Sequence, residues 1–118
     1  MKNTFLFLAL YVTIHGHSQT LTATQASSKP GQKITVCAKV VGTHVTKGKI
    51  KVIYLNLDKP YPNSPFTLVI FEKSADRFNY NPLDFLKNKF ICASGIVSEF
   101  KGKSQMVVDS QEQIEVVK

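Results

Sequence analysis

The sequence predicts an all-β protein with a single short helix. Three observations lead to this fold class. From residue 33 onward, short runs rich in β-branched and aromatic residues alternate apolar with polar side chains, as half-buried strands do. Clusters of glycine, proline and asparagine separate these runs and mark turns. Only one stretch, near residue 81, carries the start signals of a helix.

Composition supports one small globular domain. The chain has 118 residues, of which 43% are hydrophobic and 19% are charged, so it has enough apolar content to build a core. The same apolar content excludes a wholly disordered chain, and the composition, with only 6 Gly and 2 Cys, excludes a collagen-like chain and a disulfide-dense miniprotein. The 15 Lys+Arg against 8 Asp+Glu leave a formal charge of +7, which favours an acidic partner.

The first 18 residues have the features of a signal peptide. Lys2 precedes an apolar run over residues 4–14, and the small residues Gly16 and Ser18 follow it. This run is about half the roughly 20 residues that cross a bilayer. We therefore expect cleavage after Ser18, an exported protein that is periplasmic or secreted, and no membrane association afterwards. The alternative interpretation is an N-terminal core helix.

After the leader, residues 19–31 are small and polar and end in a turn signal, Pro30-Gly31. We expect this segment to be a flexible linker. The folded domain is then expected over residues 32–118.

The domain opens with two alternating runs. The first strand is expected over Lys33–Val41, and turn-forming residues over 42–48 place His44 in a loop. The second strand is expected over Lys49–Leu57, where a bulge near Val52 would restore the broken alternation. Three prolines in residues 58–65 remove amide donors and predict a stiff, exposed loop.

The second half of the domain adds three strands and the helix. The third strand, Phe66–Phe71, points Phe71 away from the core. Asn81 is the expected N-cap of a short helix that runs to Lys87. The fourth strand is expected over Lys89–Val97 and the fifth over 105–108.

The cysteines do not fit a metal or nucleophile site. Once the leader is removed, Cys37, Cys92 and His44 are the soft ligands that remain, and tetrahedral zinc needs four ligands or three plus water. Cys37 and His44 lie seven residues apart, so they point to opposite faces of one straight strand. We therefore expect no metal, no cofactor and no Cys-His catalysis.

Four segments carry a resemblance to a known family: Val36–Val40, Leu55–Pro62, Phe66–Phe71 and Cys92–Val97. Together with five strands and a helix between the third and fourth, they resemble the nucleic-acid-binding OB-fold domains, above all exported bacterial ones, including those attached to secreted nucleases. The resemblance covers residues 32–118. It implies a five-stranded OB-fold barrel in which the first and fourth strands are neighbours.

The resemblance also bears on the cysteines. Neighbouring first and fourth strands would bring Cys37 and Cys92 close together on the barrel surface, in a compartment that permits oxidation. Either a disulfide joins them or they are two separate, partly covered thiols.

In such a barrel the binding face is the outside of the second and third strands with two adjoining loops. Stacking of single-stranded nucleic acid needs exposed rings beside cations, and this face offers Tyr54, Tyr61 and Phe71 as rings, Asn56 as a partner for a base edge, and Lys47, Lys49, Lys51, Lys73, Lys101 and Lys103 as cations. The competing interpretation is that these rings are cross-strand packing partners and the lysines protect sheet edges.

We therefore predict a non-enzymatic protein that binds single-stranded DNA or RNA with little sequence preference. Catalysis is not expected, because no carboxylates cluster and a single arginine, Arg77, cannot hold the charge of phosphodiester cleavage. The alternative is an exported OB module that binds a protein partner, such as a nuclease, or a small ligand such as an oligosaccharide or cation.

Overall fold

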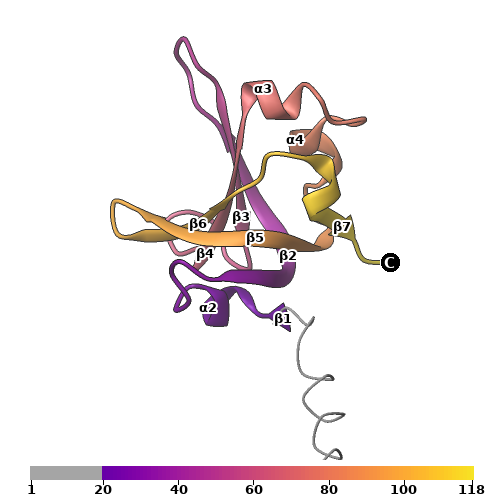
Figure 1. Ribbon diagram of the computed structural model, residues 1–118. Helices are drawn as coiled ribbons and strands as arrows, with labels where there is room; N and C mark the ends of the chain where they lie inside the picture. Colours follow the sequence, from indigo (N-terminus) through magenta and orange to yellow (C-terminus); the bar gives the residue numbers. More distant parts are fainter. Residues whose placement is uncertain (1–19) are drawn as a thin grey trace, which may run out of the picture.

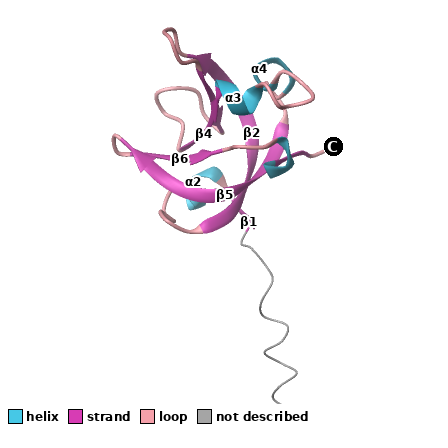
Figure 2. Cartoon of the chain, turned by 45° about the horizontal axis from the view of Figure 1, so that its top comes forward, coloured by secondary structure: helices cyan, strands magenta, loops and turns pink. Residues whose placement is uncertain are grey.

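The computed structural model describes residues 20–118, which fold mainly into strands (Figures 1 and 2). The strands are β1 (Thr20–Leu21), β2 (Lys33–Val45), β3 (Val52–Leu57), β4 (Phe66–Phe71), β5 (Phe90–Phe100), β6 (Lys103–Val107) and β7 (Ile114–Val116). Short helical turns lie between them: α2 (Ala23–Ala26), α3 (Glu72–Ala75), α4 (Pro82–Phe85) and the 3₁₀ turn η1 (Gln111–Gln113). The all-β class is confirmed, whereas the predicted signal peptide lies outside the described residues.

Five of the strands pair in a closed ring. β2 pairs with β3, β3 with β4, β4 with β6, β6 with β5, and β5 with β2 again. Within the ring only the β4–β6 pairing is parallel. β1 and β7 extend the sheet at β2 and β5, respectively, so the described chain has seven strands rather than the predicted five.

The interior of the ring holds the core. The apolar faces of β2, β3 and β4 are buried as the alternation predicts, and the largest fully buried side chains include Ile34, Leu55, Leu57, Phe66 and Leu68. The predicted short helix is confirmed as α4. Its cap is Asn81, whose side-chain oxygen accepts hydrogen bonds from the backbone N–H groups of Leu83 and Asp84.

β2 is longer than predicted because its register shifts in the middle. Val40 lies opposite Leu57, but Gly42 lies opposite Asn56, so one extra residue is accommodated in β2. The strand then continues to Val45 through the segment predicted as a turn, and His44 lies in the sheet rather than in a loop. The bulge predicted near Val52 is wrong, since β3 starts at that residue and pairs without a shift along β4.

The flexible linker predicted over 19–31 is wrong for the residues that the structure describes. β1 pairs with β2 in parallel, and α2 follows it directly. α2 has a capping box: Thr22 and Gln25 each accept a hydrogen bond from the other's backbone N–H. Its Ala23 and Ala26 are buried in the core, so their small size reflects close packing and not flexibility.

An aromatic cluster packs the loop between α3 and α4 against α4. The Tyr80 ring lies 5.4 Å from the Phe78 ring and 4.6 Å from the Phe85 ring, measured between centroids. Burial in this cluster raises the pKa of the Tyr80 hydroxyl. The Arg77 guanidinium donates to the carbonyl oxygens of Lys73 and Asp109 and so ties this region to the chain after β6.

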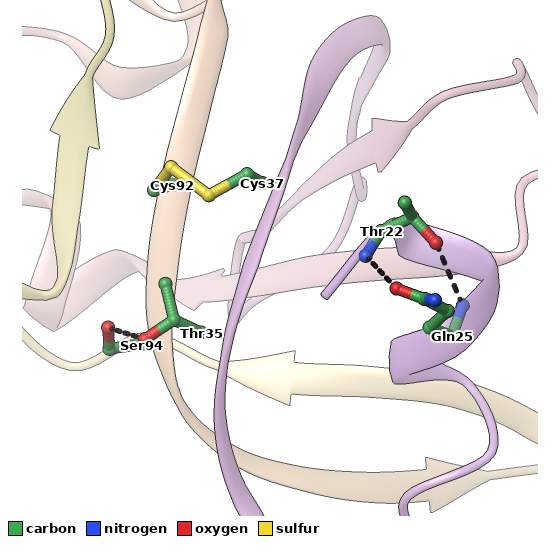
Figure 3. Close-up of a disulfide and its surroundings, with 6 residues drawn as sticks. All are labelled: Thr22, Gln25, Thr35, Cys37, Cys92 and Ser94. Atoms are coloured by element: carbon green, nitrogen blue, oxygen red, sulfur yellow. Dashed lines mark hydrogen bonds between the residues drawn. A yellow bond between two sulfur atoms is a disulfide. The ribbon is translucent and has the colours of Figure 1, made fainter. Parts of the chain in front are cut away.

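A disulfide joins β2 to β5 (Figure 3). Cys37 and Cys92 are directly opposite in the antiparallel pair, with their Cα atoms 4.0 Å apart. On the same face, the hydroxyls of Thr35 and Ser94 are 2.7 Å apart and share a hydrogen bond. The bridge is confirmed, and it is compatible with an exported protein. Among residues 20–118, no helix is both long and apolar enough to cross a membrane.

Loss of the disulfide should lower stability strongly. It closes a loop with a sequence separation of 55, and on the chain-entropy model this contributes about 4 kcal/mol to the free energy of unfolding. We expect urea unfolding to show that loss for Cys37→Ser with Cys92→Ser. Reductant should destabilise the wild-type protein, once its mass shows two added hydrogens, and leave the double variant unaffected. Equal midpoints for the oxidised and reduced wild type would contradict this.

The packing of α2 can be tested with one variant and a matched control. Ala26→Asp places a charge at a fully buried position and should lower the free energy of unfolding by at least about 2 kcal/mol. Thr24→Asp, at an exposed position of the same turn, should change it by less than about 0.5 kcal/mol. Similar small effects of both variants in thermal unfolding would mean that α2 does not pack as described.

Candidate binding cleft

An open cleft of about 750 Å³ lies on the outside of the ring. Its floor is made by Tyr54 and Asn56 of β3 and by Thr67 of β4. Its rims come from β2, from the proline-rich loop after β3 and from the β5–β6 turn, with side chains that include His44, Tyr61, Phe100, Lys101 and Lys103. Segments far apart in the sequence therefore contribute to one concave surface.

Strand alternation explains why the floor residues face outward. Leu55 and Leu57 are fully buried in the core, so Tyr54 and Asn56 point to the opposite face. The register shift in β2 brings Gly42 opposite Asn56 and His44 opposite Tyr54 on that face. The extra residue of β2 therefore places the His44 side chain at the cleft.

Two rings lie in a layer at one side of the cleft. The His44 and Tyr54 rings are 6.2 Å apart between centroids, with an angle of 20° between their planes. The two rings are near-parallel neighbours on the outer face of the sheet, and the Tyr54 side chain is half-buried. A flat ring in this position is the kind of surface on which another planar group stacks.

The proline-rich loop forms a second side. Tyr61 lies between Pro60 and Pro62 and is strongly exposed, as the three prolines predicted for this loop. The Lys103 ammonium donates a hydrogen bond to the Pro62 carbonyl oxygen at 3.1 Å. This bond joins the loop to the β5–β6 turn, so the two rims are directly connected.

The β5–β6 turn supplies a fourth ring and a cation. Phe100 and Lys103 are paired, and the two residues between them, Lys101 and Gly102, both have positive φ, 52° and 79°, as a type I′ turn requires. Phe100 is 54% exposed, and the Lys101 ammonium lies 5.3 Å from the centre of its ring. The tip of this hairpin therefore presents an aromatic face and a positive charge together.

The electrostatics of the cleft favour an anion. Two lysines, Lys101 and Lys103, line it, and none of its lining residues is acidic. Neither lysine forms a salt bridge with a carboxylate of the described chain. Their charge is thus available to a ligand, subject to screening by salt.

The structure brings together five of the ten side chains that the sequence suggested for binding: Tyr54, Asn56, Tyr61, Lys101 and Lys103. The other five lie outside the cleft. Lys47 and Lys49 are on the exposed β2–β3 loop, at the top of Figure 1. Phe71 is exposed at the end of β4, Lys73 is in α3, and Lys51 lines a separate hollow of about 280 Å³ beside Glu72 and Asp76.

Sequence reasoning missed several lining residues, among them Thr67 on the floor and His44 and Phe100 at the rims. His44 was assigned to a loop because residues 42–48 are turn-forming, whereas β2 continues through Val45 after its register shift. Phe100 was missed because the fourth strand was expected to end at Val97, whereas β5 continues to Phe100. The available signal was the Lys101-Gly102 pair, since a two-residue turn implies that both flanking strands reach it.

The sequence matches no model of a known protein family and no curated protein. The functional assignment therefore depends on the chemistry of the cleft.

Proposed function

We propose that this protein is an exported, non-enzymatic OB-fold protein that binds single-stranded nucleic acid with little sequence preference. The observation that carries the proposal is the cleft itself, where three rings, Tyr54, Tyr61 and Phe100, stand beside two lysines and no carboxylate. Unpaired bases stack on such rings, while ammonium groups follow the phosphates. Stacking and phosphate contacts are both possible with any base sequence.

The pairing of the strands supports the OB-fold part of the proposal. The ring order β2-β3-β4-β6-β5 closes on itself, and α4 lies between its third and fourth strands in chain order. In OB-folds, oligonucleotides and oligosaccharides bind over the second and third strands beside the loop that joins the fourth to the fifth. The cleft lies over β3 and β4 beside the β5–β6 turn, which corresponds to that place.

The lining residues support binding in preference to catalysis. They provide rings, hydroxyls, amides and lysines, which recognise and hold a ligand. Acid–base or metal-assisted phosphodiester chemistry would use carboxylates or clustered metal ligands at the same place. An oligosaccharide or a protein partner such as a nuclease is the competing occupant of this cleft, and oligonucleotide titration distinguishes them.

The stacking role is tested by two phenylalanines on one strand. Phe100 and Phe90 are both in β5 and are 54% and 48% exposed, but only Phe100 lines the cleft. Phe100→Ala should weaken binding of a labelled single-stranded oligonucleotide at low salt by about 5- to 150-fold, the equivalent of 1–3 kcal/mol of stacking. Tyr54→Ala should act in the same direction.

Phe90→Ala is the control and should bind like the wild type. If both phenylalanine variants bind equally, the cleft is not the binding surface. If the wild type itself binds no oligonucleotide at low salt, the proposed function is wrong.

The phosphate contacts are tested by salt dependence. Lys101 lines the cleft, whereas Lys39 is exposed on β2 outside it. Lys101→Ala should reduce the slope of log affinity against log salt concentration by about 0.7, the value for one phosphate contact with a single strand. Lys39→Ala should leave the slope unchanged. An unchanged slope for Lys101→Ala would remove this lysine from the interface.

A further inference from the structure

Two polar side chains at the floor of the cleft are joined to each other. Asn56 of β3 and Thr67 of β4 are direct cross-strand partners. The Thr67 hydroxyl donates a hydrogen bond to the Asn56 side-chain carbonyl, with Oγ1 3.0 Å from Oδ1. Each side chain therefore restricts the orientation of the other.

This bond determines what each group still offers. The single hydroxyl proton of Thr67 is used, so its oxygen retains only acceptor capacity. The Asn56 carbonyl has a partner, and its amide nitrogen, Nδ2, carries the remaining donors. The floor thus presents one donor group and one acceptor group side by side.

The Asn56 amide nitrogen is open to the cleft. Asn56 is only 7% exposed, and Nδ2 has no hydrogen-bond partner in the described chain. Among residues 20–118, no side-chain nitrogen or oxygen is both fully buried and without a partner. Nδ2 must therefore reach the space that its residue lines.

Gly42 keeps that approach free. It lies opposite Asn56, and a Cβ atom added to it would stand 3.5 Å from Nδ2. A larger side chain at this position would extend over the amide. In the free protein this donor faces the open cleft, and a ligand that displaces water from it must supply an acceptor there, because a donor left unpaired is costly.

We propose that Asn56 and Thr67 read the Watson–Crick edge of one unpaired base. This inference rests on the proposed function. On that edge every nucleobase carries a hydrogen-bond donor directly beside an acceptor, as in N3–H and O4 of thymine. The acceptor of any base would take the Asn56 amide proton, and its donor would bond to the Thr67 oxygen. The order of donor and acceptor along the edge differs between bases, but either face of a base can stack, so each base can be turned to match the pair. The pair therefore accepts all bases but rejects duplex, whose Watson–Crick edges are occupied.

Tyr54 supports the same arrangement. It precedes Asn56 by two residues on the same sheet face, so a base stacked near its ring has its edge within reach of the floor. Thr67 acts as a positioning residue for the Asn56 amide as well as a contact for the base.

A methylated oligonucleotide tests the inference. N3-methylthymidine lacks the N3–H donor and has a blocked edge, yet it keeps the stacking face and the phosphates. The wild-type protein should bind a thymidine homopolymer about 2- to 12-fold more tightly than its fully N3-methylated form, the equivalent of one hydrogen bond. Fluorescence anisotropy with both oligonucleotides measures this ratio.

Three variants identify the source of the discrimination. Thr67→Val keeps the branched shape without the hydroxyl and should bring the ratio close to one, whereas Thr67→Ser keeps the hydroxyl and should retain it. Phe100→Ala should weaken binding of both oligonucleotides and leave the ratio intact. Unfolding midpoints close to that of the wild type confirm that each variant is folded.

The outcomes separate the two proposals. If the wild type binds neither oligonucleotide, the proposed function is wrong. If it binds both equally, or if Thr67→Val keeps the wild-type ratio, nucleic-acid binding stands and edge reading by this pair is wrong.

Discussion

The closed ring depends on one strand, β2, pairing on two sides. Its residues 33–39 pair with β5, and its residues 40–45 pair with β3. The two partners lie along successive parts of β2, so its 13-residue length and its register shift after Val40 carry it from β5 to β3 and allow the sheet to close. An extra residue increases local twist and bends a strand. The same shift reverses which side chains face outward, so closure of the ring and construction of the cleft have one cause.

The two halves of β2 have separate roles. The first half carries Cys37 and is fixed to β5 by the disulfide and by the Thr35–Ser94 hydrogen bond. The second half carries Gly42 and His44 to the cleft. The disulfide thus lies away from the cleft. The side chains that line the cleft are not used in covalent bonds and remain available to a ligand. In the proposed function, non-covalent contacts alone recognise the ligand. The groups that make them are the stacked His44 and Tyr54 rings, the Asn56–Thr67 pair and the exposed Phe100.

Much of this fold could be predicted from alternation and turn residues. The buried faces of β2, β3 and β4, the capped helix at Asn81 and the outward position of Tyr54 all follow from local sequence. The predictions that were wrong concern features that depend on contacts between distant segments, or segments whose local sequence fits more than one structure. The shift after Val40 leaves no distinct local signal, so His44 was misplaced. Residues 20–31 are small and polar, and only the packing of Ala23 and Ala26 against distant strands separates them from a linker. The grouping of cleft residues depends on how three loops meet, which no single segment encodes.

The hydrogen bond from Lys103 to Pro62 has a thermodynamic consequence. It couples a proline-stiffened loop to a tight hairpin, so the gap between them is largely set before any ligand arrives. Preorganisation of this kind reduces the conformational entropy lost on association. The Lys103 ammonium has two further N–H donors for a phosphate, whereas a phosphate that drew it away from Pro62 would release the loop. The most favourable ligand is one that fits the existing width of the cleft and leaves the hydrogen bond between Lys103 and Pro62 intact.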